Sequence, residues 1–130
     1  MKLWQTLYAF IWLTVLQFML VFLPFMIPFR VEAHATVGLI VLAVAHYNRA
    51  RVKKTDALGR TKRTMNVTAG LATFQVVLGV PLVAIRFYPA LAFLEPAFRL
   101  LHLLVALAIV TQAASVATGY DIWESKESTA

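Results

Sequence analysis

Residues 96–119 read PAFRLLHLLVALAIVTQAASVATG, an apolar run whose only ionisable side chains are Arg99 and His102. A membrane-spanning helix needs about 20 predominantly apolar residues, and this run is long enough to cross a bilayer. Ionisable side chains inside such segments are rare and are usually functional. The run therefore predicts a transmembrane helix and makes His102 the first candidate for a functional side chain.

Three further apolar runs precede this one, at residues 3–27, 31–47 and 67–87. With 61% hydrophobic and 14% charged residues, the 130-residue chain is too apolar for a soluble domain and too short for more than a few spans. The sequence predicts an all-α fold with four transmembrane helices, formed by residues 1–120. A glycine, Gly119, is expected to end the fourth helix and leave residues 121–130 as a short polar cytoplasmic tail. There is no cysteine for a disulfide or a thiolate metal site.

The net charge of +6 is concentrated in one connector rather than spread along the chain. An excess of Lys and Arg marks cytoplasmic loops, so the pattern indicates a membrane topology and no nucleic-acid partner. Binding of anionic lipid or of a partner by this connector is the alternative. We expect a plasma-membrane protein with both termini in the cytoplasm. The basic residues of the connector are Arg49, Arg51, Lys53, Lys54, Arg60, Lys62 and Arg63.

The second apolar run repeats the pattern of the fourth. A proline precedes a histidine by six positions in both, Pro28 before His34 and Pro96 before His102. Helical spacing places each histidine on a stripe of small and apolar side chains. The stripes consist of His34, Gly38, Val41 and Ala45 in the second run and His102, Ala106, Ile109 and Ala113 in the fourth.

The first and third runs show a weaker form of the repeat, because Gln17 precedes Pro24 and Gln75 precedes Pro81. The two prolines are expected to kink their helices. Two repeated helix pairs related by an axis along the membrane normal would form an antiparallel four-helix bundle. Such an arrangement brings the second and fourth helices face to face, where bundles build cofactor sites.

Paired histidines in a membrane bundle are typical axial ligands of a haem iron. We therefore predict one b-type haem between His34 and His102, with Gly38 and Ala106 leaving room for the macrocycle. Structural or proton-handling roles are the alternative. His46 has no counterpart in the repeat, because Ala114 stands at the equivalent position, and it is interpreted as an interfacial polar residue.

Two arginines, Arg30 and Arg99, stand about one helical turn outward of the histidines. They could pair with haem propionates or simply reach the membrane interface. The nearby carboxylates Glu32 and Glu95 are interpreted as solvated or paired with arginine.

The same residues resemble one four-helix half of the haem A synthases, membrane enzymes that oxidise a methyl group of haem O to a formyl group. The resemblance spans nearly the whole chain and rests on three short motifs. They are Glu32-Ala33-His34, LATFQVVLGVP at residues 71–81 and HLLVALA at residues 102–108. It implies haem O and haem A as substrate and product, and Glu32 as the residue that handles the proton.

The chain departs from that family at three points. It lacks the cysteine pair that the family often carries in an outer loop, and Glu32 stands two positions before His34, where the family's acidic residue usually stands three positions before its histidine. In addition, Ala35 occupies a position where arginine is common in the family. These departures favour haem binding or electron transfer over haem A synthase-like oxidoreductase activity. The alternative function is a non-catalytic accessory subunit of a membrane respiratory complex. Expected partners are the lipid bilayer and either a respiratory oxidase complex or a second copy of the chain.

Overall fold

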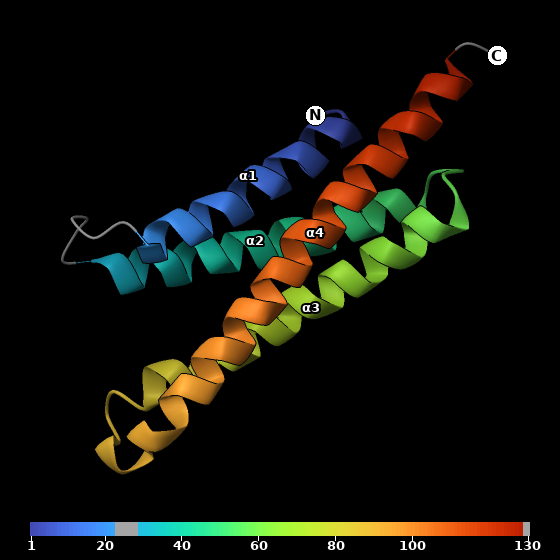
Figure 1. The fold of residues 1–130 in the computed structure, drawn as a ribbon. Helices are drawn as coiled ribbons and strands as arrows, with labels where there is room; N and C mark the ends of the chain where they lie inside the picture. Colours follow the sequence, from blue (N-terminus) through green and yellow to red (C-terminus); the bar gives the residue numbers. More distant parts are fainter. Residues whose placement is uncertain (23–28, 129–130) are drawn as a thin grey trace.

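The computed structural model describes residues 1–22 and 29–128, and this part of the chain is helical without any strand (Figure 1). The predicted all-α fold is confirmed. The connection that contains Pro24 and Pro28 lies outside the described residues. The elements are α1 (Leu3–Phe22), α2 (Arg30–Lys53), α3 (Gly59–Ala84), the short 3-10 helix η1 (Pro89–Leu94) and α4 (Glu95–Glu127).

The four long helices contact one another in a ring. Figure 1 shows the chain turning back between α2 and α3 and between α3 and α4, and α1 contacts α2 and α4, as does α3. Within the described residues, no Cα atom of α2 lies within 8 Å of a Cα atom of α4, and the same holds for α1 and α3. Helices α2 and α4 therefore lie on a diagonal, with the interior of the molecule between them.

Among the described residues, three segments are long and apolar enough to cross a membrane: Leu3–Val21, Gly59–Ala84 and Pro89–Glu127. Helix α2 has 24 residues but does not join them. It begins with Arg30 and Glu32 and ends with Arg51 and Lys53, and these charges shorten its apolar middle. Of the four membrane-spanning helices predicted from the sequence, three are thus supported by the structure.

The internal repeat is visible in the pattern of burial. Buried positions of α1 recur in α3 58 positions later, so that Thr61 follows Leu3 and Met65 follows Leu7. The inward stripes of α2 and α4 are buried at the predicted positions, which are Val41, Ala45, Ile109 and Ala113. Equivalent helix faces therefore form the core in both halves of the chain.

The prediction that Gly119 ends the fourth helix is wrong, because α4 continues to Glu127. A Cβ atom on Gly119 would lie 3.0 Å from the Oγ1 atom of Thr61 at the start of α3. The glycine therefore permits close packing of two helices. The predicted polar tail is helical as far as Glu127, and Trp123 packs against the core.

The basic connector is shorter than the sequence suggests. Helix α2 extends to Lys53 and α3 begins at Gly59, so only Lys54 of the seven basic residues lies between them. The others occupy the last turns of α2 and the first turn of α3. Arg49 donates from Nε to Asn66 Oδ1 at 2.9 Å, which ties these two helix ends together.

Candidate functional site

His34 on α2 and His102 on α4 meet across the diagonal of the helix ring. Their ring centroids are 6.2 Å apart, with 50° between the ring planes. Both residues are half-buried, and the Nδ1 atom of each is buried without a hydrogen-bond partner. The two candidate ligands, 68 positions apart in the sequence, thus share one site.

A glutamine from the preceding helix supports each histidine at the backbone. Gln17 Nε2 donates to the carbonyl oxygen of His34 at 2.9 Å, and Gln75 Nε2 donates to that of His102 at 3.0 Å. A backbone carbonyl has two lone pairs, so it can accept this bond in addition to its helical one. The hydrogen bond of Gln75 joins α3 to α4, and that of Gln17 joins α1 to α2 in the same way.

The two glutamines leave their Oε1 atoms buried and without a partner. Together with the two histidine Nδ1 atoms, four of the five such side-chain atoms in the described part of the chain belong to this site. Buried polar groups without partners are rare in proteins and require an explanation, such as an ion or a ligand.

Small residues border the site, but not all of them face the gap between the histidines. A Cβ atom on Gly38 would lie 2.9 Å from Gln17 Nε2, so Gly38 makes room for the glutamine of α1. A Cβ atom on Gly79 would lie 3.7 Å from His102 Cε1. Ala106 is half-buried one turn after His102. Sequence reasoning missed Gly79, although its position one turn after Gln75 places it on the same face.

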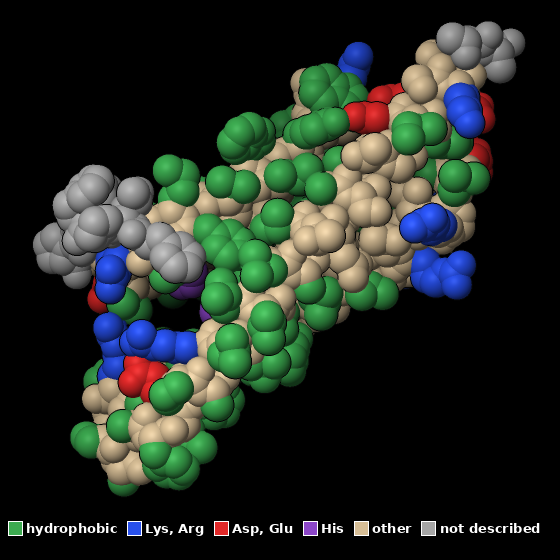
Figure 2. Space-filling model, in the orientation of Figure 1, with side chains coloured by type: hydrophobic (Ala, Val, Ile, Leu, Met, Phe, Trp, Pro, Cys, Tyr) green, Lys and Arg blue, Asp and Glu red, His purple; other side chains and the backbone are tan. Residues whose placement is uncertain are grey.

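Charged side chains gather at the end of the molecule where α2 and α4 begin. Arg30 and Glu32 are exposed on α2, and Arg99 forms an ion pair with Glu95 across one turn of α4. Arg86, which sequence reasoning did not single out, follows the end of α3 at this same end. Figure 2 shows basic and acidic side chains around a hollow here, with histidine atoms at its inner edge.

The third histidine lies apart from this site. His46 is exposed on α2, and its Nε2 atom lies 3.0 Å from the hydroxyl of Thr73 on α3. This polar contact joins α2 to α3.

Residues 1–22 and 29–128 contain no group of three or more His, Cys, Asp or Glu side chains that could hold a metal ion. No family model, no curated protein and no solved structure matches the chain. The geometry of the histidine site is therefore the main basis for a functional hypothesis.

Proposed function

We propose that this chain is an integral membrane protein that binds one b-type haem between His34 and His102. In this proposal the four helices form an antiparallel bundle of two repeated pairs in the plasma membrane, with both termini in the cytoplasm. The observation that carries the proposal is the meeting of the two imidazoles, 6.2 Å apart between ring centroids.

The spacing fits two ligands of one metal centre. Two imidazoles that bind a metal from opposite sides have ring centres about 6 Å apart, because each metal–nitrogen bond is about 2 Å and each ring centre lies about 1 Å behind its nitrogen. The diagonal position of α2 and α4, without Cα atoms within 8 Å of each other in the described residues, supports the same fit. Two protein ligands suffice for a haem, whereas a bare metal ion needs more.

The surrounding residues have distinct roles in this proposal. Gln17 and Gln75 fix the backbone of the two histidines through their carbonyl oxygens. Arg30, Arg86 and Arg99 supply positive charge at the end of the molecule where propionate groups would be neutralised. The buried side chains of Val41 and Ile109 exclude water from the inner side.

A bound haem would supply one-electron redox chemistry at its iron. Because both histidines would be needed to hold the haem, we favour electron transfer over haem A synthase-like oxidation of the ring. Glu32, the candidate for proton handling in an oxidation, is exposed on α2. Haem O or haem A as substrate or product would require exchange of the bound haem.

The absorption spectrum of the purified full chain tests the proposal. Protein from haem-replete cells should contain about one haem per chain and show the sharp reduced bands of bis-histidine ligation. A colourless protein that binds no added haem would contradict the proposal. If that protein also co-purified with an oxidase complex, the accessory-subunit function would replace it.

A further inference from the structure

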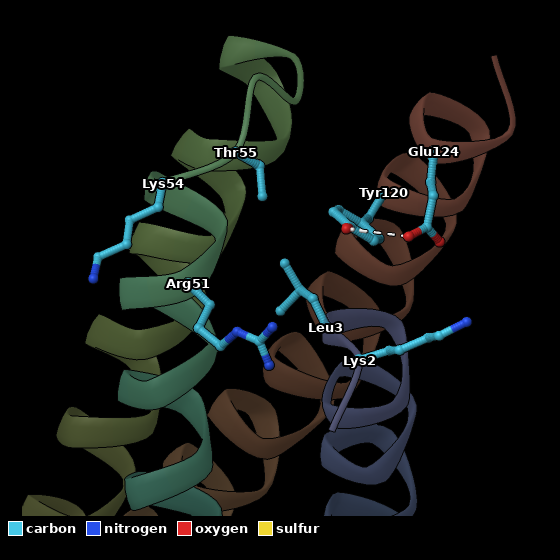
Figure 3. Close-up of a pocket in the computed structure, with 7 residues that line it drawn as sticks. All are labelled: Lys2, Leu3, Arg51, Lys54, Thr55, Tyr120 and Glu124. Atoms are coloured by element: carbon cyan, nitrogen blue, oxygen red, sulfur yellow. Dashed lines mark hydrogen bonds between the residues drawn. The ribbon is translucent and has the colours of Figure 1, made fainter. Parts of the chain in front are cut away.

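A second candidate site lies at the opposite end of the molecule from the histidines. A pocket of about 630 Å³ opens between the start of α1, the end of α2 and the last turns of α4 (Figure 3). This volume lies within the range of small-molecule sites, about 300–1,000 Å³. We call it the Arg51 pocket, after the side chain that holds its central position in Figure 3.

The charge of the Arg51 pocket favours an anion. Its lining carries three cations, Lys2, Arg51 and Lys54, and a single carboxylate, Glu124. Figure 3 shows the two lysine amines turned outward on either side of the pocket, while the arginine points between the helices. Lysine stems are flexible enough to swing toward a bound anion.

Only some of the N–H donors of Arg51 are used to hold its side chain in place. Its Nη1 atom donates to the Met1 carbonyl oxygen at 2.8 Å and to the Tyr47 hydroxyl at 3.3 Å, and its guanidinium lies 5.7 Å from the Tyr47 ring centroid. Its Nε and Nη2 atoms donate to no other described residue. A guanidinium that is already positioned and retains free N–H groups is suited to bidentate binding of phosphate.

The pocket lies at the boundary expected between membrane and water. One apolar segment begins at Leu3, which lines the pocket, and the segment that includes α4 ends beyond Glu124, which also lines it. Lipid headgroups border the hydrocarbon core at such a level. The combination of a nearly buried apolar side chain, Leu3, with a fixed guanidinium suits a ligand that has a phosphate head and an apolar remainder.

We propose that the Arg51 pocket binds the phosphate headgroup of an anionic phospholipid. This inference does not depend on the proposed haem. The net charge of the lining favours an anionic lipid over a zwitterionic one, and Glu124 weakens the attraction because it repels the phosphate.

Native mass spectrometry of the full chain in detergent, incubated with equal amounts of phosphatidylglycerol and phosphatidylcholine, tests the proposal. The wild type should retain one molecule of phosphatidylglycerol in preference to phosphatidylcholine. Arg51→Gln should weaken this preference about fivefold, the factor expected for one basic side chain near anionic lipid. Arg63→Gln is the matched control, because Arg63 is an exposed basic residue of the same end and does not line the pocket.

A gain of binding separates the effect from loss of fold. Glu124→Gln should retain phosphatidylglycerol more strongly than the wild type, because it removes the repelling charge and keeps an acceptor for Tyr120. Equal retention of the two lipids, or an Arg51→Gln variant indistinguishable from Arg63→Gln, would overturn the proposal. Complete displacement of the lipid by excess inorganic phosphate would assign the pocket to free phosphate instead.

Discussion

At the scale of single residues, the chain uses the same pair of contacts twice. In each half a glutamine of one helix donates to the carbonyl oxygen of a histidine on the next helix. The histidine side chains remain without hydrogen bonds at Nδ1, so their rings are oriented by packing and not by a polar partner. This separates the group that holds the backbone from the group available to a ligand.

The two central histidines should differ from the third in haem binding. His34→Ala and His102→Ala should each lose most bound haem, because each removes one of the two imidazoles that face each other. His46→Ala should retain the haem, since the His46 side chain hydrogen-bonds to Thr73 on α3 and is not one of the two facing imidazoles. Haem per chain, measured by pyridine haemochrome absorbance, checks this. Equal losses in all three variants would be incompatible with the proposed site.

Replacing a supporting glutamine should weaken the fold even in haem-free protein. Gln75→Leu should lower the free energy of unfolding by about 1 kcal/mol, the net value of one hydrogen bond. Gln112→Leu is the control, because the Gln112 side chain forms no hydrogen bond with another described residue. Thermal unfolding in the same detergent measures both. The assignment fails if the two variants are equally stable.

At the scale of helices, the contacts decide which features of the sequence matter. Gly119 was expected to end a helix, but α4 runs through it and packs closely on Thr61 of α3. The Tyr8 hydroxyl donates to a carboxylate oxygen of Asp121, a contact that joins α1 to the extended part of α4. The additional turns of α4 therefore complete the ring of helices at this end.

The two helical glycines Gly119 and Gly70 should respond differently to added bulk. Gly119→Val should destabilise the protein by about 1–3 kcal/mol, as overpacking does, because Thr61 is buried and its Oγ1 atom would lie only 3.0 Å from the added Cβ atom. Gly70→Val should be nearly neutral, since a Cβ atom there meets nothing within 4 Å. Unfolding curves of the two variants in one detergent provide the comparison. Similar stability of the two variants would contradict the packing role of Gly119, because replacing Gly by Val improves helix propensity at both positions.

At the scale of the whole molecule, the two ends carry different chemistry. The end where α2 and α4 begin holds the histidines and three arginines, and the other end holds the seven basic residues and the Arg51 pocket. In the proposed membrane arrangement, the length of the helices would place the two proposed sites in opposite leaflets. Lys and Arg near helix ends favour the cytoplasmic side, so the Arg51 pocket should face the cytoplasm.

Cysteine labelling in intact cells measures this orientation, and the chain has no native cysteine to interfere. Gly59→Cys, at the start of α3, should be protected from a membrane-impermeant maleimide until the cells are opened. Ala90→Cys, exposed in η1 at the other end, should react from outside and serves as the positive control. Labelling of Gly59→Cys from outside would reverse the topology and the leaflet of both sites.

The sequence by itself determined the helical class, the repeat and the inward stripes that include Val41, Ala45, Ile109 and Ala113. These features follow from local hydrophobicity and helical periodicity, which act within one segment. It also selected His34 and His102, because ionisable side chains in apolar segments are rare.

Only the tertiary structure decided how the helices use their small and polar residues. The roles of Gly38 beside Gln17, of Gly119 beside Thr61 and of Arg51 near Leu3 depend on which neighbouring helix approaches each position. Such contacts join positions far apart in the chain, and local propensity contains no information about them. For that reason a glycine that resembles a helix stop became a packing position in α4, since burial against a neighbour outweighs propensity.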